Sequence, residues 1–234
     1  MQASETESLY NLLSLPFEAV DGKGISLDDI NFSNGSVSAR AANADTIMLW
    51  VDKGEGVFDY ENWTHKSTGW IKVGTSDGFA DCYPDGLPVG TAFWYKAAKR
   101  AVAGTATVSG AVCPDDYVEM EIIRDQYNFV SFPYPTALKL NDANQVDWGD
   151  ASTSARAAQA DTIMLWVKKG NGQYDYENFT KKSAGWTCVA TGNLFEDEYP
   201  DGVAVGTGFW YKPYNKAGAS ATFKVKFTSP LASK

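Results

Sequence analysis

The chain has 234 residues, of which 44% are hydrophobic and 21% are charged, as in ordinary folded globular proteins. Acidic residues outnumber basic ones by 29 to 20, which gives a formal net charge of −9. This balance argues against binding to nucleic acid or to an anionic membrane surface, because both select for basic patches. No apolar run approaches the ~20 residues of a membrane-spanning helix, so membrane insertion is not expected.

Most of the chain occurs twice. Residues 38–96 recur 116 residues later, with about 40 of the 59 aligned positions identical. The repeat extends back to the segments YNLLSLPF and YNFVSFPY, which begin at Tyr10 and Tyr127. Repetition over so long a stretch indicates duplication of a whole domain. We therefore predict two homologous domains, residues 1–115 and residues 116–234, each of ordinary domain size.

Each copy begins with the same predicted strands. The first, in YNLLSLPF or YNFVSFPY, ends at a proline, which cannot donate a hydrogen bond to a neighbouring strand. A variable polar section follows, in which ISLDDI and LKLNDAN predict either a short strand or one helical turn. Next comes TIMLWV, which is apolar on both of its alternating faces. This pattern predicts a central strand that is covered on both sides.

A K-G-x-G turn, whose glycines permit positive φ, joins TIMLWV to a return strand in VFDYENW or QYDYENF. GWIKV and GWTCV predict another short strand, and a Y-P-D-G turn leads into the apolar strands TAFWYK and TGFWYK. The last strands are TATVSGAV and TFKVKF, the second with Phe223, Val225 and Phe227 pointing inward. YVEMEII, after a linker near residues 112–116, predicts either the first strand of the second domain or a bridge between the domains.

About six or seven strands in each copy, with turns every 8–12 residues or so, predict an all-β fold. We expect two tandem domains that are β-sandwich-like or open barrels. SARAA is the one helix-like stretch, and it is too short to form a stable helix alone.

Several of these motifs together resemble a known class of module. The pattern N-x-x-S-x-P-(F/Y), then D-x-I-x-L-W, G-x-(G/A)-F-W-Y and a closing T-x-T-V-x-G is similar to a β-rich repeat module of exported proteins from gut and environmental bacteria. The resemblance covers nearly all of both copies. It implies an all-β fold, secretion and an extracellular or cell-surface location, and it transfers no assigned activity and no catalytic residue. MQAS at the start fits a mature end behind a signal-peptide cleavage site, which also favours export.

The three cysteines, Cys82, Cys113 and Cys188, have no cysteine at the equivalent position of the other copy. A disulfide that the fold requires would be expected in both copies, so we predict free thiols, with a Cys82–Cys113 bridge as the alternative. The only histidine is His65, so the chain has no Cys/His spacing typical of a metal site. No metal or cofactor is predicted. Cation binding by one acidic cluster is left open: Glu196, Asp197, Glu198 and Asp201.

Candidate catalytic groups are few. His65 lies in a polar turn, is replaced by lysine in the second copy and is predicted to be a surface residue. Asp59 and Glu61 recur in the second copy and share one face of a strand, as paired catalytic carboxylates would. A solvated strand face explains them as well. We expect no enzymatic activity.

Aromatic residues give the strongest functional signal. Those within the most apolar strands are predicted to belong to the core: Trp50, Trp94, Trp166 and Trp210. Those near the hairpins are predicted to bind a ligand: Tyr60, Trp63, Trp70, Tyr176, Phe179 and Trp186. Trp63 shares its strand face with two acids, an unusual choice for a buried surface, so we expect it to be at least partly exposed. The alternative is that the hairpin aromatics also fill the core or the seam between the domains.

These features predict a non-catalytic exported module that acts in structure, adhesion or protein interaction, through a protein partner or self-association. The alternative is a carbohydrate-binding module in which the hairpin aromatics stack on a polysaccharide.

Overall fold

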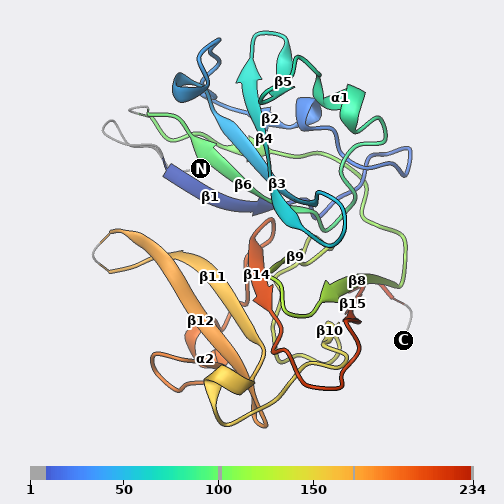
Figure 1. Cartoon of the computed structure of the whole chain (residues 1–234), viewed down its shortest axis with the longest axis vertical. Coiled ribbons are helices and arrows are strands. Elements are labelled where there is room, and N and C mark those ends of the chain that lie inside the picture. Colours follow the sequence, from blue (N-terminus) through green and yellow to red (C-terminus); the bar gives the residue numbers. More distant parts are fainter. Residues whose placement is uncertain (1–8, 100–101, 171, 233–234) are drawn as a thin grey trace. The chain divides into compact units, whose positions relative to one another are not determined.

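The computed structural model, which describes residues 9–99, 102–170 and 172–232, confirms the all-β class (Figure 1). The chain divides into two compact units, Met1–Cys113 (unit 1) and Pro114–Lys234 (unit 2). The described strands form four sheets, two in each unit, and none of these sheets closes into a barrel.

The large sheet of unit 1 has the antiparallel strand order β1-β6-β3-β4-β5. Its strands are β1 (Leu9–Ser14), β3 (Thr46–Asp52), β4 (Phe58–Lys66), β5 (Gly69–Lys72) and β6 (Ala92–Ala97). TIMLWV and FWYK therefore lie inside the sheet, as their two-sided apolar character predicted. The turn between β3 and β4 uses positive φ at Gly54 and Gly56, which also confirms the prediction.

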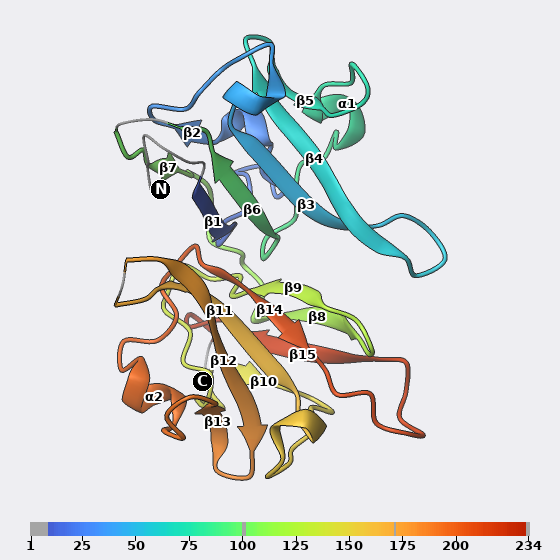
Figure 2. The same ribbon diagram turned by 60° about the vertical axis from the view of Figure 1, so that its left-hand side comes forward.

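A second, smaller sheet of unit 1 pairs β2 (Asn31–Phe32) with β7 (Ala106–Thr107) (Figure 2). Three short helical segments complete the described part of this unit: η1 (Leu27–Asp29), η2 (Ala41–Asn43) and α1 (Phe79–Cys82). The segment η1 confirms the helical alternative for ISLDDI. The helix α1 was not predicted, because four residues are too few to show a helical period.

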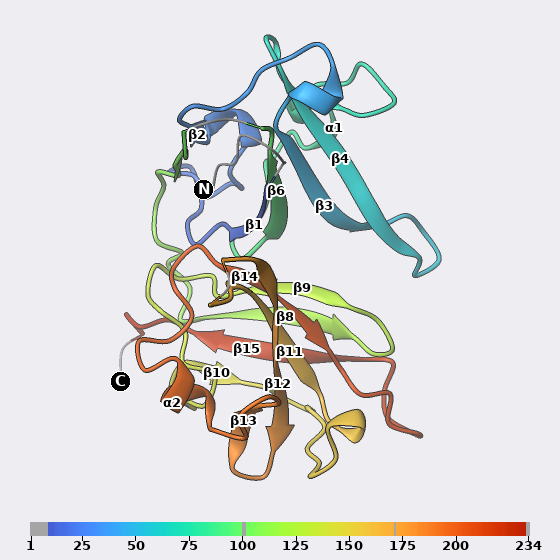
Figure 3. The same cartoon turned by 90° about the vertical axis from the view of Figure 1, so that its left-hand side faces the viewer.

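Unit 2 repeats the large sheet in the order β13-β12-β11-β14-β9 (Figure 3). These strands are β9 (Asn128–Ser131), β11 (Thr162–Lys168), β12 (Tyr174–Lys182), β13 (Gly185–Cys188) and β14 (Gly208–Lys212). The small sheet of unit 2 has three strands in the order β10-β15-β8: β8 (Tyr117–Ile123), β10 (Val146–Asp147) and β15 (Thr222–Thr228). The short helical segments are η3 (Ala157–Gln159) and α2 (Phe195–Glu198).

One face of the large sheet lies against the core of its unit. In unit 1 the core includes Ile47 and Leu49 from β3 and Phe93 from β6, packed with Leu27 of η1 and Phe79 of α1. Ile163 of unit 2 is fully buried like its counterpart Ile47, as predicted for equivalent positions. Each unit therefore places its large sheet on one side of the core and its short elements on the other, which is a sandwich-like arrangement.

A buried aspartate at the start of the central strand ties each unit together. Asp45 accepts the N–H of Ser36 at 2.9 Å, the N–H of Ala98 at 2.8 Å and the hydroxyl of Tyr95. Asp161 does the same in unit 2 with the N–H of Tyr214 and the hydroxyl of Tyr211. The D-T-I-M-L-W motif therefore has two roles. Its aspartate accepts hydrogen bonds from other segments of the unit, and the residues that follow form the central strand.

All three cysteines are free thiols, so the alternative Cys82–Cys113 bridge is absent. We predict that the melting temperature is the same with and without a reductant, because no disulfide constrains the unfolded chain. Thermal unfolding with and without dithiothreitol, followed by circular dichroism, checks this. A drop of several degrees in reductant would contradict it.

Candidate functional site

Four of the six predicted ligand-binding aromatics are buried. Trp63, Trp70, Phe179 and Trp186 are at most 1% exposed, so the predicted exposed platform is wrong at these positions. Trp63 packs edge-on against Phe79 of α1, with ring centroids 5.1 Å apart. These side chains contribute to folding and cannot stack on a ligand.

The error arose from the acids on the same strand face. Glu61 is itself only 8% exposed. Its carboxylate accepts the indole N–H of Trp63 at 3.2 Å and the hydroxyl of Tyr83 at 2.9 Å, and it pairs with Lys72 at 2.5 Å. The face is buried because these donors compensate the charge. Of the two acids, Asp59 and Glu61, only Asp59 is exposed to solvent as the interpretation of a solvated strand face predicted.

The electrostatics of this cluster follow from its contacts. Burial raises the pKa of Glu61, but the hydrogen bonds from Lys72 and Tyr83 outweigh it and hold the pKa below its usual value. Burial and the bond to Glu61 raise the pKa of the Tyr83 hydroxyl. In unit 2, Glu177 keeps the tyrosine bond, at 2.6 Å to Tyr199. Each carboxylate therefore accepts a hydrogen bond from a tyrosine of its own unit.

The remaining two predicted aromatics, Tyr60 and Tyr176, are half-buried on the sheet face opposite the core. The hydroxyl of Tyr60 accepts the indole N–H of Trp94 at 3.2 Å, and Tyr176 accepts that of Trp210 at 3.1 Å. Trp50 and its counterpart Trp166 lie edge-on to these tyrosines. The four tryptophans predicted to belong to the core therefore lie with these tyrosines on the sheet face opposite the core. Trp94 and Trp210 are nevertheless buried there.

A polar groove in unit 2 is a candidate site. It has a volume of about 610 Å³ and lies between the Val146–Thr153 region and the β12–β13 turn. Pockets for small ligands usually measure roughly 300–1,000 Å³. Its polar lining residues are Asn141, Asp147, Thr153, Lys181, Lys182 and Ser183. Trp148 supplies a buried apolar wall.

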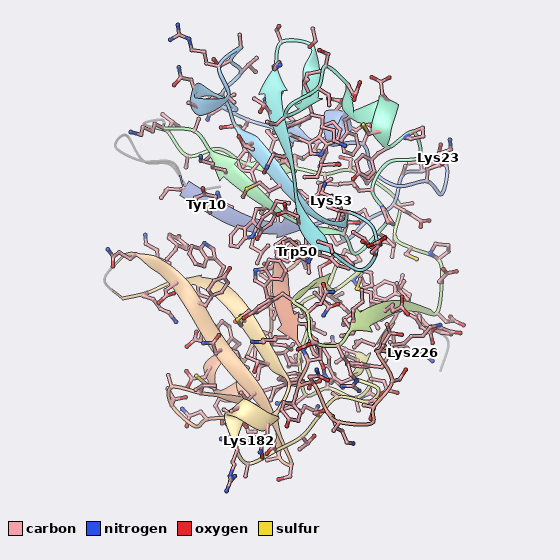
Figure 4. All side chains as sticks on the ribbon, viewed as in Figure 1. Tyr10, Lys23, Trp50, Lys53, Lys182 and Lys226 are labelled. Atoms are coloured by element: carbon pink, nitrogen blue, oxygen red, sulfur yellow. The ribbon has the colours of Figure 1, made fainter. Side chains whose placement is uncertain are left out.

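The two lysines of the groove come from the end of β12, and Lys182 marks this place in Figure 4. The ammonium group of Lys181 lies 5.3 Å from the ring centre of Trp186. Burial lowers the pKa of Lys181, while the carboxylates of Asp161 and Asp147 oppose this shift. Neither lysine forms an ion pair with any described residue. The groove thus presents two cationic donors beside one acidic acceptor.

The same position in unit 1 carries His65, whose ring stacks on Trp70 with centroids 4.7 Å apart. Burial lowers the pKa of His65 against the opposing effect of Asp45 and Asp28. His65 is partly exposed, and stacking on a core tryptophan removes the rest of its ring from water. Each unit therefore places a titratable base over its buried tryptophan.

The acidic cluster of unit 2 divides its bonds among different partners. Glu196 binds the side chain and N–H of Asn141, and Asp197 accepts the N–H of Leu194 at the start of α2. Glu198 accepts donors from the Thr191 and Asn193 side chains. Over the described ranges, no three His, Cys, Asp or Glu side chains gather as metal ligands would. These carboxylates hold the local fold.

The groove was missed from the sequence because its walls lie far apart along the chain. One wall is the variable polar section, which carried no strong motif, and the other is a hairpin turn. The replacement of a histidine by lysine at position 181, followed by a second lysine, was the only local signal.

No family model, curated protein or solved structure matches this chain. None of the helices in the described part of the chain has the length and apolar character needed to cross a membrane.

Proposed function

We propose that this chain is a non-catalytic adhesion module, exported to the cell surface, that binds a carboxylate-bearing saccharide in the groove of unit 2. The observation that carries the proposal is the pair of lysines at the end of β12, which line a groove of about 610 Å³ without an ion-pair partner among the described residues.

The lining chemistry favours a ligand that carries both hydroxyl groups and an anion. Lys181 and Lys182 offer charge-assisted hydrogen bonds to a carboxylate. Asp147 accepts hydrogen bonds from hydroxyls, while Thr153 and Ser183 donate and accept them. A uronic acid presents these groups together on one ring. In a chain of net charge −9, these two neighbouring lysines place local positive charge in the groove, which an acidic ligand would match.

We expect Lys181→Met and Lys182→Met each to weaken binding of an oligogalacturonate by about tenfold, because each removes a charge-assisted hydrogen bond. Methionine keeps the apolar stem of Lys181 over Trp186, so packing is largely preserved. Isothermal titration calorimetry on the full chain measures the affinity, with a neutral galacto-oligosaccharide of equal length as the ligand control.

Lys168→Met is the matched protein control, because this lysine is exposed on β11 and does not line the groove. It should leave the affinity unchanged, and raised salt should weaken binding to the unmodified chain. Equal binding of the neutral and acidic sugars would contradict the role of the carboxylate. A loss in Lys168→Met as large as that in Lys181→Met would contradict the location, and no binding of the oligogalacturonate would contradict the proposal itself.

A further inference from the structure

The small sheets of the two units differ by one strand. In unit 2, β15 lies between β10 and β8 and pairs with β8 over seven positions. Figure 3 shows β8 and β15 side by side. In unit 1 the described strands of the small sheet are only β2 and β7. The duplication thus allows the two described strands of unit 1 to be compared with the three-stranded sheet of unit 2, in which β8 is the additional strand.

The corresponding positions can be matched through the cores. Phe32 stacks on Tyr95 in unit 1, and Trp148 stacks on Tyr211 in unit 2, so Phe32 and Trp148 occupy equivalent places. The residues just before them pair across the small sheets: Asn31 with Thr107, and Asp147 with Lys226. The equivalent positions that follow from this register are Ala106 with Val225 and Val108 with Phe227.

Backbone groups of unit 1 also point toward the side of β7 that faces away from β2, where the described residues provide no further strand. Ser33 donates its N–H to the carbonyl of Thr105 at 2.9 Å, so Thr105 faces β2. Directions alternate along an antiparallel strand, so Thr107 also faces β2, while Ala106 directs its N–H and C=O groups away from it. Val108 directly follows the end of β7, and continuing the same alternation by one residue turns its N–H and C=O groups outward as well. No described residue hydrogen-bonds to these outward groups. In unit 2, the equivalent residues pair with Met120 and Val118 of β8.

The burial of the side chains at this edge also differs between the two units. Val225 and Phe227 are 0% exposed beneath the completed sheet of unit 2. Ala106 and Val108 are only partly buried against the core of unit 1. An added strand would therefore bury apolar surface as well as pair backbone groups, and the two contributions act together in strand addition.

The sequence of β8 in unit 2 indicates which residues a strand added beside β7 of unit 1 would carry. In β8, Val118, Met120 and Ile122 alternate with exposed Glu119 and Glu121, and Ile122 is fully buried. The sequence that precedes Leu9, MQASETES, has alanine and glutamate at the positions equivalent to Met120 and Ile122. That sequence lacks the apolar alternation of β8.

We propose that the edge of β7 in unit 1 accepts an antiparallel β-strand from a partner protein, and that this strand carries apolar residues at alternate positions as β8 does. This is a protein-binding site separate from the saccharide groove of unit 2. Exposed edges that recruit a strand are a recurrent mode of peptide recognition.

A synthetic peptide with the sequence of residues 117–124, YVEMEIIR, is the probe, added to the full chain. Hydrogen exchange followed by NMR reads the amides of Ala106 and Val108. We expect both amides to exchange rapidly in the free chain and to slow by about tenfold or more at saturating peptide. A peptide with serine at the three apolar positions should give no protection.

Val108→Pro removes one outward N–H while sparing the bonds to β2, because proline is tolerated on an edge strand whose N–H faces away from the sheet. It should abolish the protection, whereas Val37→Pro, in an exposed loop of unit 1, should leave it intact. Unchanged exchange of the β3 amides shows that both variants are folded. The proposal is overturned if Ala106 and Val108 are already protected in the free chain, if the peptide does not bind, if the serine peptide binds equally well, or if protection changes only in β15.

Discussion

Replacing Asp161 with alanine is expected to lower the free energy of unfolding of unit 2 by about 3–5 kcal/mol. The side chain is fully buried and accepts the N–H of Tyr214 at 2.7 Å and the hydroxyl of Tyr211. Alanine leaves both buried donors without an acceptor, and each then costs its full desolvation free energy. Native-state hydrogen exchange of the β14 amides should accelerate by about 100-fold or more, because each 1.4 kcal/mol or so is a factor of ten.

The duplication supplies the controls for this substitution. Asp45→Ala removes the equivalent anchor from unit 1, so the acceleration should appear mainly in β3 and β6. Asp201→Ala removes an exposed carboxylate of unit 2 and should change exchange very little. Unchanged β14 exchange in Asp161→Ala would contradict the anchoring role.

The anchor also predicts a pH dependence. Burial raises the pKa of Asp161, although hydrogen bonds from Tyr211, Tyr214 and Ser152 oppose this shift. A carboxyl whose pKa is higher in the folded state binds its proton more tightly there. The contribution of Asp161 to stability is therefore present at pH values below the ordinary pKa of an aspartate, and it is lost as the pH rises through the higher pKa of the folded state. The side chain of Asp161→Asn cannot titrate. The free energy of unfolding of the unmodified chain, relative to that of Asp161→Asn, should therefore fall as the pH rises from the ordinary pKa to the folded pKa.

The strands were readable from the sequence because local chemistry fixes them. TIMLWV is apolar on both faces, and it forms the central strands β3 and β11. Glycines mark the turn that follows, at Gly54 and Gly172, both with positive φ. These are signals carried within a few residues. The repeat strengthened these predictions, because each pattern occurs twice.

The sites were less readable because contacts between distant residues decide them. Glu61 looks like a surface acid on its strand, yet Tyr83 and Lys72 reach it from other elements and make its burial tolerable. Trp63 was misassigned with it. The groove of unit 2 joins segments about 40 residues apart, and Lys181 lines it only because β12 ends there.

The second prediction concerns this misassigned tryptophan. Trp63→Ala is expected to lower the free energy of unfolding of unit 1 by about 3–5 kcal/mol, because it empties a fully buried site in the core. The indole contacts Phe79 and Tyr83 and donates a hydrogen bond to Glu61. Native-state exchange of the β4 amides measures the loss.

Trp63→Phe is the control that separates cavity from hydrogen bond, since unit 2 has Phe179 at this place and buries it equally. It should cost less than the alanine substitution, about 1–2 kcal/mol, because phenylalanine refills most of the volume and only withdraws one donor from Glu61. The carboxylate keeps Lys72 and Tyr83. An exposed stacking residue would behave in the opposite way: alanine would leave the exchange of β4 unchanged and weaken binding of a ligand. Finding that pattern for Trp63 would restore the aromatic platform and contradict the buried core described for unit 1.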